Sequence, residues 1–392
     1  MAILPPLRFT GATLLRDGAL QRRSLCVEQG RISRGAFPEV DLSGYLILPG
    51  IIDLHGDAFE RHIAPRPRAP FPIRSGLSSA ARDAAAHGVT TAWFAQCWSW
   101  EGGLRGPDYA EDLLGALQAF APSALIDIRL QIRCETHMVD SRDRLLAAIR
   151  RFGVDYVIFN NHLPEAIDVA KKDPMEFATW AKRSGRSSEE FIKVLREAKD
   201  RKSEVPRHLC ALAEAFDVLG VTYGSHDDPD AETREEFRLL GAHVAEFPTS
   251  EKAAAAAKAM NDPVLMGAPN VARGGSQSGN ISAQRLIERG LCDALVSDYH
   301  YPALAAAAWT LVDKDVKTLP DAWAMISTKP AEIMGLSDRG ALDFGKRADL
   351  VVVDEDTREI EATISNGRIA YMSGQIGERL ARSGRDVRMA AE

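Results

Sequence analysis

The sequence predicts an α/β protein built on a (β/α)8 TIM barrel, with a small β domain formed by both ends of the chain. From about residue 45 to 335, short apolar runs rich in β-branched and aromatic residues alternate with longer helical patterns, which is typical of repeated βα units. Polar residues follow these runs at their C-terminal ends, as they do at the active-site face of such a barrel. A doubly wound open sheet is the alternative, and the regular placement of polar residues argues against it.

Eight segments are the predicted barrel strands, in the chain order YLILPGIIDLH, GVTTAWFAQC, DIRLQIRCE, VDYVIFNNH, GVTYGSHDD, HVAEFPTS, PVLMGAPNV and DALVSDYH. The predicted helices between them include LSSAARDAAAHG, DSRDRLLAAIRRFG, RHLCALAEAFDVLG, DAETREEFRLLG, SEKAAAAAKAM and ISAQRLIERG. Several of these end in glycine, the residue that best adopts the left-handed conformation of a helix C-cap.

In this prediction the barrel comprises residues 49–339, and the small β domain combines residues 1–48 with residues 340–392. Both ends contain short strand patterns, and the dipeptides Asp17-Gly18 and Asn366-Gly367 fit β-hairpin turns. Residues at about 163–206 are charged and helix-prone, and they predict a helical insertion beside the barrel mouth. The insertion is either a lid or a solvated helical hairpin without a role.

The composition is that of an ordinary globular protein, with 45% hydrophobic residues, 26% charged residues and a formal net charge of -7. This acidic balance argues against general binding of nucleic acid. The five cysteines are scattered without a CxxC pair, which favours reduced thiols over a disulfide framework or a zinc finger. Because the chain starts without a signal-peptide pattern and contains no run long enough to cross a membrane, we expect a cytoplasmic protein with no membrane partner. Whether it forms a homo-oligomer is left open.

Residues suited to binding metal ions stand where the predicted strands end. His55 and Asp57 lie at alternate positions at the end of the first strand, so we expect both side chains on one side. Four further candidates at or near other strand ends are Glu135, His162, His226 and Asp298. Together the six predict two divalent cations bridged by Glu135. Nitrogen and oxygen ligands without thiolate suit zinc, manganese, iron or cobalt, with zinc as the first choice.

Asp298 has a second candidate role. A carboxylate beside a metal ion can accept the proton of an attacking water molecule and later deliver it to the leaving group. Asp298 is therefore the candidate catalytic base, and a purely structural ligand or a helix N-cap is the alternative reading.

Two clusters are suited to binding anions. The first follows the first strand and contains Arg61, His62, Arg66 and Arg68. The second lies in APNVARGGSQSGN after the seventh strand, where backbone N–H groups exposed by glycine, hydroxyl groups and one guanidinium form an anion cradle. Its candidate residues are Asn270, Arg273, Gly274, Gly275, Ser276 and Ser278. Because both clusters should face the same barrel mouth, they indicate a small phosphorylated substrate.

Several motifs together resemble the amidohydrolase superfamily: LPGIIDLHGD, GVTT, VSDY, STKPAEIMGL and GALDFGKRADLVVVD. The resemblance covers essentially the whole chain. Within the superfamily, DLHGDAFERHIAPRPR, IRCE, GSHDD, EFPTS, MGAPNVARGGSQSGN and SDYHYPAL resemble the phosphonate-metabolism branch called PhnM. This resemblance implies a metal-dependent diphosphatase of the carbon–phosphorus lyase pathway, which hydrolyses α-D-ribose 1-methylphosphonate 5-triphosphate to the 5-phosphate and diphosphate.

By position, His55, Asp57, Glu135, His226 and Asp298 match the ligand positions that the resemblance implies. The ligand histidine of the sixth strand in other amidohydrolases is missing, because His243 stands at the start of that strand and its end reads EFPTS. His162 is the expected replacement.

Two other functions remain open at this point. One is hydrolysis of a C–N bond in a cyclic amide, an N-acyl compound or an amino-purine, as in the wider superfamily. The other is a metal-free, non-catalytic barrel. The arginine-rich mouth favours a phosphorylated substrate over the first, and the retained ligand residues argue against the second.

Overall fold

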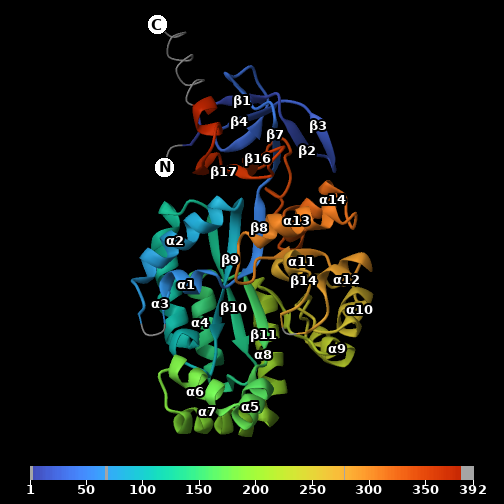
Figure 1. Cartoon of the computed structure of the whole chain (residues 1–392). Coiled ribbons are helices and arrows are strands. Elements are labelled where there is room, and N and C mark those ends of the chain that lie inside the picture. The colour runs from blue at the N-terminus through green and yellow to red at the C-terminus, as the bar shows by residue number, and fades with distance from the viewer. Residues whose placement is uncertain (1–2, 67–68, 278, 381–392) are drawn as a thin grey trace.

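The computed structural model describes residues 3–66, 69–277 and 279–380. The eight predicted barrel strands are all present and parallel, and they neighbour one another in chain order (Figure 1). They are β8 (Ile51–Gly56), β9 (Val89–Trp98), β10 (Asp127–Glu135), β11 (Tyr156–Asn160), β12 (Thr222–His226), β13 (Val244–Glu246), β14 (Val264–Gly267) and β15 (Ala294–Val296). A bridge between Gly56 and Asp298 brings the last strand back to the first, so the predicted barrel is confirmed as nearly closed.

The helices cover the outside of the barrel, because their apolar faces pack on the outward side chains of the strands in one continuous core. These helices are α2 (Ile73–Ala86), α3 (Pro107–Phe120), α4 (Arg142–Phe152), α8 (Val205–Leu219), α9 (Ala231–Leu239), α10 (Glu251–Ala259), α12 (Ala283–Glu288) and α13 (Ala303–Asp313). A second cluster, which includes Ile52, Trp93, Tyr156 and Leu265, joins strands from across the barrel and therefore fills its interior. Short helices α14 (Leu319–Ala324) and α15 (Thr328–Ile333) follow.

The strands at the two ends of the chain form two further sheets. One has the order β18 (Arg368–Met372), β17 (Ile360–Ser365), β16 (Leu350–Asp354), β7 (Tyr45–Pro49), β2 (Thr13–Arg16) and β3 (Ala19–Arg22). The other has the order β5 (Arg31–Ser33), β4 (Leu25–Glu28), β1 (Leu7–Thr10) and β6 (Glu39–Asp41). Both predicted hairpins are confirmed, since Asp17-Gly18 joins β2 to β3 and Asn366-Gly367 joins β17 to β18, all with positive φ.

The first predicted strand is in fact two strands. Tyr45–Pro49 (β7) pairs with the terminal strands, whereas Ile51–Gly56 (β8) opens the barrel. Gly50 separates them at a point where the backbone runs close to β9, and a Cβ atom there would lie 2.4 Å from Thr90 Oγ1. One apolar run therefore serves two sheets.

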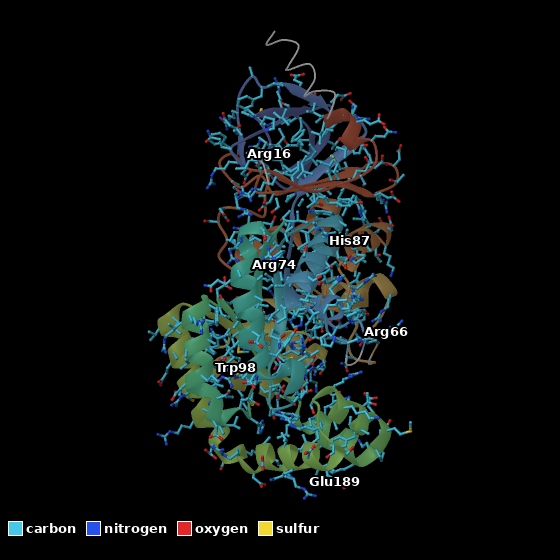
Figure 2. All side chains as sticks on the ribbon, turned by 90° about the vertical axis from the view of Figure 1, so that its left-hand side faces the viewer. Arg16, Arg66, Arg74, His87, Trp98 and Glu189 are labelled. Carbon is cyan, nitrogen blue, oxygen red and sulfur yellow. The ribbon has the colours of Figure 1, made fainter. Side chains whose placement is uncertain are left out.

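The predicted insertion is helical and consists of α5 (Leu163–Lys172), α6 (Pro174–Arg183) and α7 (Ser188–Asp200). It has its own apolar core, in which Phe177 and Phe191 pack around Trp100 from the end of β9. Figure 2 shows the insertion, marked by Glu189, at the far end of the molecule from the terminal sheets, marked by Arg16. It therefore lies beyond the barrel end that carries the site.

The five cysteines are free thiols. Within the described residues, no helix combines the length and the apolar character needed to cross a membrane.

Candidate active site

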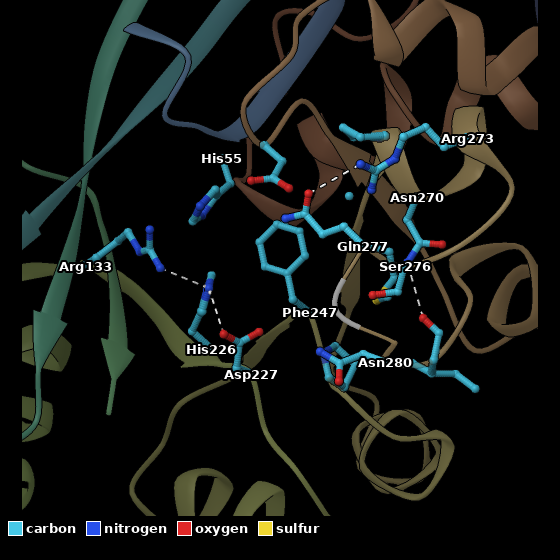
Figure 3. Close-up of a pocket in the computed structure, with 16 residues that line it drawn as sticks. His55, Arg133, His226, Asp227, Phe247, Asn270, Arg273, Ser276, Gln277 and Asn280 are labelled. Carbon is cyan, nitrogen blue, oxygen red and sulfur yellow. Dashed lines mark hydrogen bonds and ion pairs between the residues drawn. The ribbon is translucent and has the colours of Figure 1, made fainter. Parts of the chain in front are cut away.

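A cavity of about 220 Å³ opens at the C-terminal ends of the barrel strands (Figure 3). Three of the predicted metal residues line it: His55, His226 and Asp298. The other lining residues are Arg133, Asp227, Phe247, Pro248, Met266, Gly267, Pro269, Asn270, Arg273, Ser276, Gln277, Asn280 and Ile281. The strands thus bring together side chains that are far apart in the sequence.

Glu246, at the end of β13, joins the two histidines of the cavity. Its Oε2 atom lies 2.8 Å from His55 Nδ1 and 3.2 Å from His226 Nδ1. Its Oε1 atom accepts hydrogen bonds from Gln131 Nε2 at 2.6 Å and from the Tyr156 hydroxyl at 2.7 Å. The four bonds occupy the acceptor positions of a carboxylate, and Glu246 is fully buried. Burial favours the protonated form, but the adjacent histidines outweigh it and hold the pKa of Glu246 well below its usual range.

Sequence reasoning missed Glu246. The segment EFPTS stands out by its missing histidine, which does not point to its glutamate. The available signal was an acidic residue at a strand end, the same signal that singled out Glu135.

The protonation of the histidines follows from their partners. Arg133 Nη2 lies 3.2 Å from His226 Nε2, and an arginine can only donate, so this nitrogen of His226 is unprotonated and Nδ1 carries the proton toward Glu246. Burial lowers the pKa of His226, and Arg133 adds to this effect. For His55, Glu246 outweighs burial and raises the pKa. In both residues Nδ1 is engaged with Glu246, so a metal ion would bind through Nε2, and at His226 the ion would replace the hydrogen bond from Arg133.

This donor set fits a divalent metal ion. Histidine ligands commonly bond a carboxylate through their second nitrogen, which fixes the ring and increases its basicity. His55, His226 and Glu246 place one donor atom each within 4.8 Å of the others.

Asp298 is held beside this group by the closure of the barrel. Its backbone N–H donates to His55 O at 3.0 Å, and its carbonyl accepts from Asp57 N at 2.8 Å. Asp298 takes a positive φ of 56°, which turns the chain directly after β15. Burial raises the pKa of Asp298 to about 6, the Asp57 carboxylate adds to the rise, and His55 and Arg133 act against it. Asp57 itself lies just after β8 and is half-buried.

The other two predicted ligands belong to a second group. Glu135 Oε1 contacts His162 Nδ1, and Glu101 completes a trio with donor atoms within 4.8 Å of one another. Glu135 also accepts from Trp100 Nε1 at 3.2 Å, while Glu101 is paired with Arg105 at 3.2 Å. Burial opposes the effect, but His162 keeps the pKa of Glu135 below its ordinary value.

The six residues predicted to form one centre therefore lie in two places in the described structure. The side chain of Arg133 stands between them on β10, so bridging of two cations by Glu135 remains a prediction. The sequence motifs do not point to Glu101 either. The insertion contacts it, because the Arg186 guanidinium donates to its carbonyl oxygen.

The described residues of the predicted anion cluster after β8 do not line the cavity. Arg61 donates to the carbonyl of Tyr299, and His62 pairs with Asp83 of α2 at 3.0 Å; both stand on α1 (Phe59–Ile63). Arg66 is exposed, and Figure 2 places it at the edge of the molecule. Arg68 lies outside the described residues.

The cluster after β14 reaches the cavity more fully. The predicted loop begins as a short helix, α11 (Ala268–Arg273), and Asn270, Arg273 and Ser276 all line the cavity. Arg273 lies over the Tyr299 ring at 5.8 Å, and the N–H group of Gly275 bonds Asn270 O at 2.8 Å. Gly274 ends the helix with a φ of +83°. Ser278 lies outside the described residues.

A barrel with terminal β-sheets, and with histidines and carboxylates at its strand ends, is the architecture of amidohydrolases. The model of the amidohydrolase family matches residues 46–370, and the chain belongs to this family. Among curated proteins, it is similar to α-D-ribose 1-methylphosphonate 5-triphosphate diphosphatase of Escherichia coli K12. The two are 32% identical over 368 residues, which are 88% of this chain and 95% of the relative.

Solved structures of other amidohydrolases share the fold. A β-aspartyl dipeptidase from Fervidobacterium islandicum AW-1 superposes with a TM-score of 0.62 at 14% identity, covering 94% of this chain and 97% of its own. An N-acyl-D-glutamate deacylase from Bordetella bronchiseptica superposes with a TM-score of 0.59 at 17% identity, with the same shares covered. At these identities the likeness concerns the fold alone.

Proposed function

We propose that this amidohydrolase-family hydrolase is a diphosphatase that converts α-D-ribose 1-methylphosphonate 5-triphosphate to the 5-phosphate and diphosphate. The observation that carries the proposal is the joint presence in one cavity of two carboxylate-held histidines, the carboxylate Asp298 and the guanidinium of Arg273. The similarity to the Escherichia coli diphosphatase supports the same substrate. The same similarity supports a role for this chain in phosphonate metabolism.

Divalent metal ions, zinc first, would be held by His55 and His226, with Asp57 and Asp298 beside them. A second ion would be held by Glu135 and His162. Such ions supply Lewis acidity toward a phosphoryl oxygen and toward the attacking water.

The chain's own residues would then act as follows. Asp298 accepts a proton from the water that attacks the phosphorus nearest the ribose. The bond between this phosphorus and the oxygen that bridges it to the second phosphorus breaks, and diphosphate departs with that oxygen and the electron pair of the bond. Arg273 offsets the charge of the outer phosphates, and Asp298 can return its proton to a product oxygen. A pKa of about 6 leaves most of Asp298 ionised, and thus able to act as a base, at neutral pH.

The test is an assay of diphosphate release from the ribosyl triphosphate with added zinc, manganese or cobalt. Replacement of Asp298 by Asn should lower kcat by about 100-fold or more, because the amide cannot accept the proton. Metal content measured on the same sample should stay close to that of the wild type.

Two results would overturn the proposal. Release of ammonia from an amide or amino-purine substrate, without release of diphosphate, would assign the site to C–N hydrolysis. Undiminished diphosphate release by Asp298→Asn would remove Asp298 from the role of base.

A further inference from the structure

Arg133 occupies the centre of the site, although it stands outside the set of candidates that the sequence motifs suggest. Along β10, Gln131, Arg133 and Glu135 point to the inside of the barrel at successive heights. Gln131 bonds Glu246, Arg133 bonds His226, and Glu135 contacts His162. Arg133 therefore stands between the two candidate metal groups and lines the cavity.

No carboxylate pairs directly with Arg133, although the charges of Asp57 and Asp227 act on it from farther away. Its Nη2 atom donates to the neutral His226 ring at 3.2 Å. When the Asn160 amide is oriented with its oxygen toward Arg133, that oxygen accepts from Nη2 at 3.1 Å and from Nε at 3.2 Å. In the part of the chain that the structure describes, no carboxylate oxygen lies within 4.0 Å of the Arg133 nitrogens, and Nη1 is the donor without an assigned acceptor.

Other interior arginines of the chain differ from Arg133 in this respect. Arg234 lies 3.4 Å from Asp228, and Arg339 lies 2.7 Å from Asp127. A guanidinium stays charged at all accessible pH values, and Arg133 is half-buried on the wall of the cavity without a directly paired anion. An anionic ligand in the cavity would supply this partner.

The cavity has a second guanidinium on its other side. Figure 3 shows Arg133 and Arg273 approaching from opposite sides, with His55 and His226 on the Arg133 side. Arg133 lies on the barrel strand β10, whereas Arg273 is the last residue of α11, the short helix that follows β14. A chain of phosphates with several negative charges suits two such cations better than a neutral amide does.

We infer that Arg133 binds the phosphoryl group that undergoes attack, through Nη1–H hydrogen bonds to its non-bridging oxygens, while Arg273 binds the outer phosphates. This assignment rests on the proposed function and adds to it the inner anion-binding residue. Guanidinium groups at this position stabilise the charge that gathers on the phosphoryl oxygens during transfer.

The test compares Arg133→Gln, Arg133→Lys and Arg133→Ala with the wild type, using inorganic triphosphate as the probe in titration calorimetry, with and without added divalent metal. Arg133→Gln should weaken triphosphate binding by about 10- to 100-fold, since a charge-assisted pair is lost. Arg133→Lys should bind better than Arg133→Gln, because it keeps the charge without the fork geometry.

A matched control stands on the same strand. Arg129 lies four residues before Arg133, where it pairs with Asp155 at 2.6 Å and covers Trp93 at the other end of β10. Arg129→Gln should bind triphosphate as the wild type does. Methylguanidinium added to Arg133→Ala should restore part of the binding, which a purely structural role would not allow.

Each outcome has a defined meaning. Wild-type affinity in Arg133→Gln would overturn the inference, and so would absence of rescue combined with equal binding by the Lys and Gln variants. If triphosphate binding depends on Arg133 but the wild type releases no diphosphate from the ribosyl triphosphate, the proposed function fails while the inference stands. If the wild type binds no triphosphate at about 10 mM, both fail.

Discussion

Glu246 is the residue on which the arrangement of the candidate metal centre depends. One carboxylate oxygen holds both histidine rings, and the other is held by Gln131 and Tyr156. Such a shared carboxylate sets the tautomer and the orientation of both rings at once. Its position on β13 means that the sixth strand contributes to the centre without a histidine.

Replacement of Glu246 by Gln should weaken zinc binding by about 10- to 100-fold, because an amide offers one acceptor oxygen and turns an NH2 group toward side chains that donate. Metal content after dialysis against limiting zinc measures the effect. Glu236→Gln, an exposed change on α9, is the control and should bind zinc normally. Equal zinc affinity in the two variants would show that Glu246 does not orient the ligands.

At the scale of elements, helix α1 is held to α2 by a carboxylate shared between two histidines. Asp83 of α2 lies 3.0 Å from His62 Nε2 and 3.3 Å from His87 Nδ1. The hydrogen bonds from His62 and His87 keep the pKa of Asp83 below its usual range, and Asp83 raises the pKa of His87. The chain that follows His55 is thus fixed by a pair of helices outside the cavity.

Replacement of Asp83 by Asn should therefore lower the thermal midpoint more at about pH 6 than at about pH 9. A histidine with a raised folded-state pKa contributes its full stability below its unfolded pKa and loses it as the pH rises through the folded value. Asp83 remains ionised across this range because its own pKa is lowered.

Thermal unfolding of both proteins at the two pH values measures the difference. Asp200→Asn, on the exposed end of α7, is the control and should show no dependence on pH. The same loss of midpoint at both pH values for Asp83→Asn would contradict a charged contact.

For the whole molecule, a metal centre that joins different strands should couple metal binding to stability. The candidate ligands come from β8, β12 and the segment after β15, which are distant in the chain and meet only in the closed barrel. An ion that binds only the folded state adds stability according to its free concentration and its dissociation constant.

Removal of metal with a chelator should lower the thermal midpoint by about 3 °C, the shift expected for an ion held at roughly 100 times its dissociation constant in a chain of this length. Readdition of zinc should restore the midpoint, while magnesium at the same concentration is the contrasting ion. A metal-free purified protein whose midpoint does not respond to zinc would argue for the non-catalytic barrel.

The sequence by itself determined the barrel, because each strand and helix is encoded locally by apolar periodicity, glycine caps and turn dipeptides. It also predicted that His55, His226 and Asp298 lie at the barrel mouth, where they line the cavity, since a polar residue at a strand end faces the mouth wherever the strand lies. Only the tertiary structure divided the first apolar run between two sheets, paired Glu135 and His162 apart from the cavity, placed Arg133 in the cavity and buried Glu246 behind its two histidines. These features depend on which side chains from distant strands meet and satisfy one another's charge. Local sequence patterns do not indicate these side-chain contacts, because the contact energies arise only when the barrel closes and water is excluded.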